Sequence, residues 1–112
     1  MRSVRVCARL LVAVLAVVMV FATLTPAQAA SRRTWQRLAN CESGGRWHIN
    51  TGNGYYGGLQ FSAGTWRAYG GHRYARTANH ASKTQQIRVA ARVKHHQGWG
   101  AWPVCSRRIG VR

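Results

Sequence analysis

The clearest helical pattern in the chain places apolar side chains on the same face as an acid. The residues of that face recur at i, i+3, i+4 and i+7: Trp35, Leu38, Ala39 and Glu42. We expect a helix over residues 35–43, capped at its start by Thr34 and ended by two glycines, Gly44 and Gly45. Glu42 therefore lies on the apolar face of the predicted helix.

Two further helices are predicted from their caps and their periodicity. Ser62 begins a helix that runs to about Tyr69 and stops at two glycines. Ser82 and Gln85 match a capping box, and the longest helix follows over residues 83–97. One broad face of this helix is apolar, with basic residues mostly opposite, and is made of Ile87, Val89, Ala90, Ala91 and Val93.

The segment between the first two helices, residues 47–61, is rich in glycine and aromatic residues and lacks helical periodicity. Its Asn53-Gly54 pair is a turn signal, so we expect a short hairpin or an ordered loop. Residues 98–105 are read as irregular. The pattern as a whole predicts a small α+β domain, mainly α, with about three helices.

The first thirty residues have the pattern of a secretory signal. Three arginines precede an uncharged, largely apolar run over residues 10–24, and small residues in an A-x-A pattern follow. The run is short for a membrane span, which needs roughly 20 apolar residues, so a permanent anchor is the weaker alternative. Cleavage after Ala29 or Ala30 divides the chain into a signal peptide, 1–30, and one domain, 31–112. We therefore expect a secreted protein, free or associated with the cell wall.

The charge of the chain restricts both its partners and its chemistry. Lys and Arg number 17 against a single acid, Glu42, and three of the 17 lie in the predicted signal, which leaves +13 on residues 31–112. Such a charge favours polyanions: nucleic acid, anionic lipid or an anionic bacterial wall. One carboxyl group excludes any mechanism that needs two protein carboxylates, and it argues against a calcium or magnesium cage of acidic side chains.

The cysteines and histidines point to a disulfide and to no metal centre. Export and an even count after removal of Cys7 favour a bond between Cys41 and Cys105; a pair of free thiols is the alternative. The only histidines close in sequence, His95 and His96, are adjacent and point to different faces of a helix. Neither His-Glu-x-x-His nor Cys-x-x-Cys occurs, so we expect no metal and no other cofactor.

Glu42 is the candidate catalytic group. Burial on an apolar face raises the pKa of a carboxyl, and a protonated Glu is the group that protonates a glycosidic oxygen. Arg37 or Arg46 would lower that pKa, and the sequence leaves the balance open. The alternative role for Glu42 is to neutralise part of the positive charge.

The middle segment offers groups that suit a sugar ligand. Flat rings for stacking come from Trp47, Tyr55, Tyr56 and Trp66. Hydrogen-bonding side chains come from Asn50, Thr51, Asn53, Gln60 and Thr65. Gly57 and Gly58 would let a ligand approach the backbone. The alternative is that aromatic residues fill the core, which we expect of Trp35, Phe61 and one or both of Trp99 and Trp102; at least one of the two tyrosines should be exposed.

These residues together resemble a known family. The motif Cys41-Glu42-Ser43-Gly44-Gly45, then Trp47, then residues 49–61, is similar to the resuscitation-promoting factor (Rpf) domain of actinobacteria. Thr65-Trp66 and residues 100–105 fit the same pattern. The resemblance implies a lysozyme-like fold, secretion, and cleavage of peptidoglycan between N-acetylmuramic acid and N-acetylglucosamine.

By this resemblance Glu42 matches the catalytic acid, Cys41 and Cys105 match the disulfide, and Thr65 and Gln97 fall at positions that line the substrate cleft. The chain departs from many members at three positions, Gln36, Arg46 and Ser62. Because Ser62 replaces a possible second carboxylate, hydrolysis by two carboxylates is untenable, and the alternatives are a mechanism with one acid or a weak enzyme.

Two functions follow as hypotheses. The first is a secreted peptidoglycan-cleaving enzyme that promotes wall remodelling and the growth of dormant cells, with Glu42 as its single general acid and base. The second is a non-enzymatic cationic effector that binds the wall or acts on membranes. For the first we expect a monomer whose partners are glycan strands, anionic wall polymers and other cell-wall hydrolases, without nucleic acid or stable membrane insertion.

Overall fold

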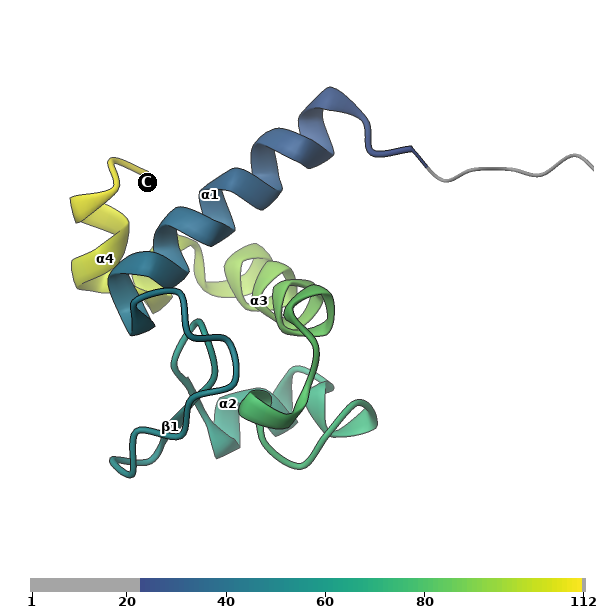
Figure 1. The fold of residues 1–112 in the computed structure, drawn as a ribbon, viewed down its shortest axis with the longest axis vertical. Coiled ribbons are helices and arrows are strands. Elements are labelled where there is room, and N and C mark those ends of the chain that lie inside the picture. Colours follow the sequence, from purple (N-terminus) through teal and green to yellow (C-terminus); the bar gives the residue numbers. More distant parts are fainter. Residues whose placement is uncertain (1–22, 112) are drawn as a thin grey trace, which may run out of the picture.

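The computed structural model describes residues 23–111, in which helices predominate (Figure 1). The α-helices are α1 (Pro26–Ser43), α2 (Ala63–Ala68), α3 (Lys83–Gln97) and α4 (Pro103–Arg108). The strands are β1 (Tyr55–Tyr56) and β2 (Phe61–Ser62), and three short 3₁₀ helices are η1 (Gly71–Arg73), η2 (Ala78–His80) and η3 (Trp99–Ala101). The predicted mainly helical α+β class is confirmed, and η3 and α4 replace the irregular segment that we expected after α3.

Helix α1 starts earlier than the sequence pattern indicated. It begins at Pro26, so Thr34 lies inside the helix and the prediction that Thr34 is the cap is wrong. Proline suits the first turn of a helix, and the residues up to Thr34 contain neither glycine nor a further proline to interrupt it. The first turns of α1 extend beyond the rest of the domain (Figure 1). Of the predicted signal peptide, residues 1–22 lie outside the described residues, and its division from the domain stays a prediction.

The N-terminal ends of α2 and α3 are capped by the predicted residues. The Ser62 side chain accepts a hydrogen bond from the backbone N–H of Thr65 at 3.1 Å. Ser82 and Gln85 form the full capping box, in which each side chain bonds the other residue's backbone N–H. These bonds satisfy N–H groups that a helix start leaves without partners.

The core lies where α1, α3 and the segment around η3 and α4 meet. The buried aromatic residues include Trp35, Phe61 and Trp102, as predicted, while Trp99 is partly buried against Trp35. Ala91 is exposed, so its predicted place on the buried face of α3 is wrong. The buried face is centred on Val89 and Val93, and the position one turn before them belongs to a polar residue that the pattern missed, Gln86.

Gln86 is fully buried and joins three loops. Its side-chain amide donates to the backbone carbonyl of Trp47 at 2.8 Å and to that of Ala81 at 3.0 Å. Its side-chain oxygen accepts from the N–H of Gly58 at 3.0 Å. Every polar atom of this amide group therefore has a partner, which is the condition for burying it.

The glycine-rich segment forms two successive tight turns. Strands β1 and β2 pair antiparallel, with Tyr55 opposite Ser62 and Tyr56 opposite Phe61. An isolated antiparallel bridge joins Asn50 to Tyr56, so the Asn53-Gly54 signal lies inside the first turn. The predicted hairpin is confirmed, with a second turn at residues 57–60.

The disulfide Cys41–Cys105 ties the end of α1 to α4, with 5.7 Å between the two α-carbons. This confirms the predicted bond and places it one residue from Glu42. No helix within residues 23–111 is both long and apolar enough to cross a membrane.

Candidate active site

Glu42 lies in the last turn of α1, on the wall of an open hollow of about 400 Å³. Tyr55 and Gln60 from the hairpin segment form another side of this hollow. The opposite side is the run from the end of η3 into α4, which consists of Ala101, Trp102, Pro103, Val104 and Cys105. The disulfide therefore fixes two walls of the hollow relative to each other.

A second hollow of about 230 Å³ continues from the first. The two share four lining residues: Tyr55, Gln60, Ala101 and Trp102. The second hollow is also lined by Thr65 at α2 and by Gln97 at the end of α3. We call the combined surface the groove: it runs from Glu42 at one end to Thr65 and Gln97 at the other.

The environment of Glu42 favours its protonated form. The side chain is half-buried, and desolvation by this burial raises the pKa of the carboxyl above its ordinary value of 4.5. The two arginines that were expected to oppose this shift are engaged with backbone carbonyls. Arg37 Nη2 donates to Ile109 O at 2.8 Å, and Arg46 Nε donates to Ser43 O at 2.8 Å. The cause of the raised pKa is burial, which gives the direction that the sequence left open.

Ser43, the residue after Glu42, connects the end of α1 to the hairpin segment. It is buried, and its Oγ lies 2.8 Å from the backbone oxygen of Gly58 and 3.1 Å from that of Ala39. The same Oγ accepts from the N–H of Arg46 at 3.1 Å. The serine of the Glu-Ser pair therefore anchors the hairpin segment to the helix end that presents the acid.

Gln60 sits at the junction of the two hollows in an unusual backbone conformation. Its φ is +54°, and it is the one non-glycine residue with positive φ in the described part of the chain. Such a conformation costs free energy and persists where the surroundings hold it, often at functional sites. Its Nε2 donates to Gly57 O at 3.1 Å, and its Oε1 accepts from Thr51 Oγ1 at 3.4 Å. The side chain is therefore held in place at the groove.

Tyr55 supplies the exposed aromatic surface of the groove, with 47% of its surface accessible. Tyr56 is partly buried and packs against the core. The two adjacent tyrosines thus point differently, as expected, and Tyr55 is the one that can stack on a sugar ring.

Two tryptophans that were candidates for stacking belong to the core. Trp66 is fully buried, and Trp47 is 9% exposed, with Lys83 Nζ 5.3 Å from its ring centre. The glycines also have another role than the expected approach of a ligand. A Cβ on Gly58 would lie 2.5 Å from the Trp47 ring, and one on Gly57 would lie 2.5 Å from Gln86 Oε1. These glycines make room for buried side chains.

Asn50 is exposed on the first turn, where its Oδ1 accepts from the N–H of Gly52 at 3.0 Å, and it does not line the groove. Residues 103 and 104 line the groove although the sequence analysis did not name them as site residues. Val104 is 58% exposed, so it offers an apolar surface beside Glu42. The signals that could have pointed to it are its position next to Cys105 and its place in the matched run of residues 100–105.

Comparison of the sequence with known proteins assigns the chain to a family. Residues 29–105 match the transglycosylase-like domain. The chain is 61% identical over 85 residues to resuscitation-promoting factor Rpf1 of Corynebacterium glutamicum, a match that covers 76% of this chain and 44% of that protein. It is 55% identical over 86 residues to resuscitation-promoting factor Rpf of Micrococcus luteus, which covers 77% of this chain and 37% of that protein.

Resuscitation-promoting factor RpfE of Mycobacterium tuberculosis is 58% identical over 83 residues, or 74% of this chain and 46% of that protein. The chain spans less than half the length of these three relatives. It belongs to the transglycosylase-like domain family, in the form found in resuscitation-promoting factors. The small helical domain with its two-stranded hairpin is consistent with the lysozyme-like fold expected from the resemblance.

Proposed function

We propose that this domain cleaves the glycosidic bond between N-acetylmuramic acid and N-acetylglucosamine in peptidoglycan, with Glu42 as its single general acid and base. The observation that carries the proposal is the position of Glu42: it is half-buried, which raises the pKa of its carboxyl, and it opens onto a groove, so that it can reach a glycan. General acid catalysis needs both conditions.

In the first step Glu42 donates its proton to the glycosidic oxygen as the bond to the anomeric carbon breaks. The departing sugar keeps the bonding electron pair and leaves as an alcohol, while positive charge develops on the ring that remains. The protein has no second carboxylate to stabilise this charge. The acetamido oxygen of the substrate can do so by bonding to the anomeric carbon.

In the second step the Glu42 carboxylate accepts a proton from the attacking oxygen. If the attacking oxygen is the C6 hydroxyl of the same sugar, the product has a 1,6-anhydro end; if it is water, the product has a reducing end. Both routes return Glu42 to its protonated state, so one carboxyl group completes the cycle. Mass spectrometry of the sugar ends after digestion of purified peptidoglycan distinguishes the two routes.

The groove provides side chains suited to holding a glycan across this acid. Tyr55 presents an exposed ring for stacking, and Gln60, Thr65 and Gln97 present amide and hydroxyl groups toward the same surface. Replacement of Tyr55 by Ala should raise KM more than it lowers kcat, because the ring contacts substrate away from the reacting oxygen. Equal loss in kcat and kcat/KM would instead assign Tyr55 to the chemical step.

The biological role that we propose is secretion to the cell wall, there to remodel peptidoglycan and promote the growth of dormant cells. Support comes from the names of the relatives and from the signal pattern of residues 1–30. The domain would act as a monomer on glycan strands, beside other cell-wall hydrolases. A cationic effector without enzymatic activity is the alternative, favoured by the charge alone, and a Glu42→Gln protein that retained full resuscitating effect would support it.

A further inference from the structure

Three arginines from two different elements gather around one phenol on the side of the domain formed by η1 and α3. Arg73 ends η1 and directly precedes Tyr74, while Arg88 and Arg92 are four residues apart on α3 and share a helix face. Hydrogen bonding by Arg88, and then by Arg92 and Arg73, lowers the pKa of the Tyr74 hydroxyl. Helix α3 packs against η1, and Arg92 Nη1 lies 3.0 Å from the backbone oxygen of Tyr69, so the arginines of α3 lie beside the segment that contains Arg73 and Tyr74.

The positive surface continues from Tyr74 toward α2. A neighbouring hollow of about 290 Å³ is lined by Ala63, Arg67, His72, Arg76 and Thr77. We define the basic face as the five exposed arginines around Tyr74 and around this hollow: Arg67, Arg73, Arg76, Arg88 and Arg92.

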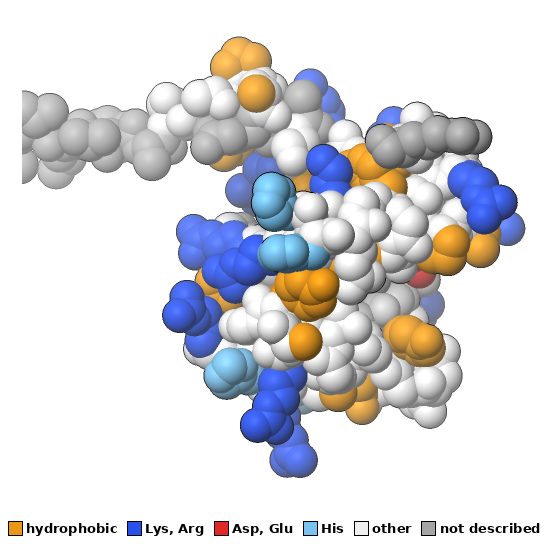
Figure 2. Space-filling model, turned by 180° about the vertical axis from the view of Figure 1, so that it is seen from behind, with side chains coloured by type: hydrophobic (Ala, Val, Ile, Leu, Met, Phe, Trp, Pro, Cys, Tyr) orange, Lys and Arg blue, Asp and Glu red, His pale blue; other side chains and the backbone are white. Residues whose placement is uncertain are grey.

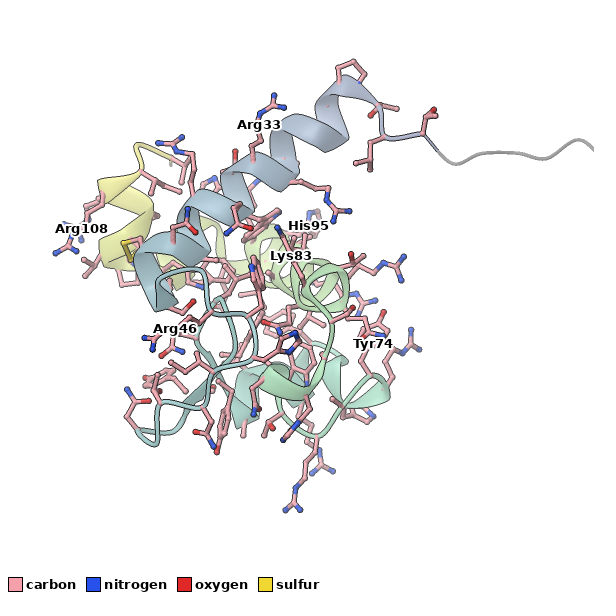
Figure 3. All side chains as sticks on the ribbon, viewed as in Figure 1. Arg33, Arg46, Tyr74, Lys83, His95 and Arg108 are labelled. Carbon is pink, nitrogen blue, oxygen red and sulfur yellow. A yellow bond between two sulfur atoms is a disulfide. The ribbon has the colours of Figure 1, made fainter. Side chains whose placement is uncertain are left out.

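The centre of the basic face lies away from the Glu42 end of the groove. In Figure 3 Tyr74 and Arg46, which follows the α1 end that carries Glu42, stand on opposite sides of the domain. In Figure 2 Lys and Arg side chains are most numerous along the left and lower edges, with others at the top and upper right, and the single acidic patch is recessed on the right. A ligand held around Tyr74 would therefore leave the Glu42 end of the groove open.

This concentration of charge has no counter-charge in the protein. The sequence holds one acid, Glu42, and it lies in the groove. Like charges four residues apart destabilise a helix, so Arg88 and Arg92 do not serve the stability of α3. Arg92 is nevertheless held in place, because its Nη1 donates to Tyr69 O at 3.0 Å. Uncompensated cations that gather on one face are suited to bind an anion.

The residue types indicate which anion. Guanidinium groups match phosphate oxygens with paired hydrogen bonds, and five arginines spread over two adjoining patches suit a chain of phosphates better than a single ion. A membrane is a poorer fit, since interfacial binding adds apolar side chains to basic ones. The exposed large apolar residues of the described chain, Leu24, Tyr55 and Val104, lie outside the basic face.

We propose that the basic face is a second binding site, which takes the phosphodiester groups of an anionic wall polymer of the poly(glycerol phosphate) type. The proposal rests on the proposed function in one respect, since a wall-cleaving enzyme is what brings the domain to such a polymer. The site would hold the domain on the wall while the groove engages successive glycan bonds.

The test measures binding of poly(glycerol phosphate) to the chain that carries R73Q, R88Q and R92Q. At about 0.1 M salt we expect roughly tenfold weaker binding or more, and a smaller salt dependence, because three phosphate contacts are lost. The matched control carries R33Q, R107Q and R108Q, which remove the same charge from exposed positions on α1 and α4 and should change binding much less. A set with Lys at positions 73, 88 and 92 keeps the charge without the planar fork and should recover only part of the affinity.

Equal weakening by both triple variants would overturn the proposal, because it would reduce the effect to net charge. Tighter, face-dependent binding to phosphatidylglycerol vesicles or to single-stranded DNA of equal charge would overturn it as well.

Two further arms separate this proposal from the enzymatic one. Glu42→Gln should bind the polymer like the unaltered protein. On peptidoglycan stripped of phosphodiester polymers with hydrofluoric acid, the R73Q, R88Q and R92Q protein should release muropeptides at the normal rate, and on native walls it should be slower. Equal rates on native walls would contradict the retention role, whatever the behaviour of Glu42→Gln.

Discussion

Removal of the disulfide should cost the domain much of its stability and also disturb its site. The bond closes a loop with a sequence separation of 64 residues, for which the chain-entropy relation gives about 4 kcal/mol at 25 °C. Small domains have only about 5–15 kcal/mol in total, and this one has a small core, so a Cys41→Ala, Cys105→Ala protein should be close to the limit of folding. With a urea dependence of about 1–2 kcal/mol per M, the midpoint should fall by about 2–4 M.

Urea unfolding followed by tryptophan fluorescence measures this shift, with Arg108→Ala, an exposed change on α4, as the control. Under conditions in which the cysteine-free protein is still folded, its turnover should also fall. The reason is geometric: Cys41 precedes Glu42, and Cys105 lies in the facing wall of the groove. An unchanged midpoint would refute the entropic argument, and an unchanged kcat in the folded variant would refute the coupling to the site.

Three further predictions concern single residues. Gln86→Leu should lower the free energy of unfolding by about 3 kcal/mol or more, because it leaves the N–H of Gly58 and two backbone carbonyls buried without partners. Urea titration measures this loss, and a value below about 1 kcal/mol would show that the three loops rearrange to satisfy these groups. Gln60→Gly should leave stability unchanged or raise it by up to about 1 kcal/mol, because glycine accepts positive φ. Its kcat/KM should fall, because the side chain is lost from the groove. A kcat/KM equal to that of the wild-type protein would show that the Gln60 side chain has no part in substrate binding or catalysis.

Glu42→Gln should change stability in a pH-dependent way. Because burial raises the pKa of folded Glu42 above 4.5, the folded protein holds this proton more tightly than the unfolded chain, and wild-type stability declines as pH rises through that folded pKa. Below pH 4.5 the variant and the wild-type protein should be equally stable, and above it the variant should be the more stable of the two. Thermal melts in which the difference in stability grows as the pH is lowered would contradict this prediction.

Much of the fold was accessible from the sequence because it is encoded locally. The caps Ser62 and Ser82 use side-chain bonds to residues three positions on, so the starts of α2 and α3 could be read directly. The disulfide followed from export and an even number of cysteines, without knowledge of the fold. Glu42 stood out because it is the only acid and lies on an apolar helix face.

The missed features depend on contacts between distant segments. Trp47 resembled a stacking residue, but its ring is enclosed by the backbone at Gly58, eleven positions on. Gln86 was not among the residues assigned to the buried face of α3, and the folded loops at residues 58, 47 and 81 explain its burial. The start of α1 was misjudged because Thr34 is a good cap, whereas the preceding residues are good enough helix formers to continue the turn.

The central claim is tested most directly by the rate at which Glu42→Gln digests purified peptidoglycan, measured as muropeptides released. Glutamine keeps the shape of the side chain and removes the proton donor, so the rate should fall by roughly 10² or more while wall binding is retained. No other carboxylate side chain exists to replace it. Digestion by Glu42→Gln at the wild-type rate would show that Glu42 is not the acid and that the proposed mechanism is wrong.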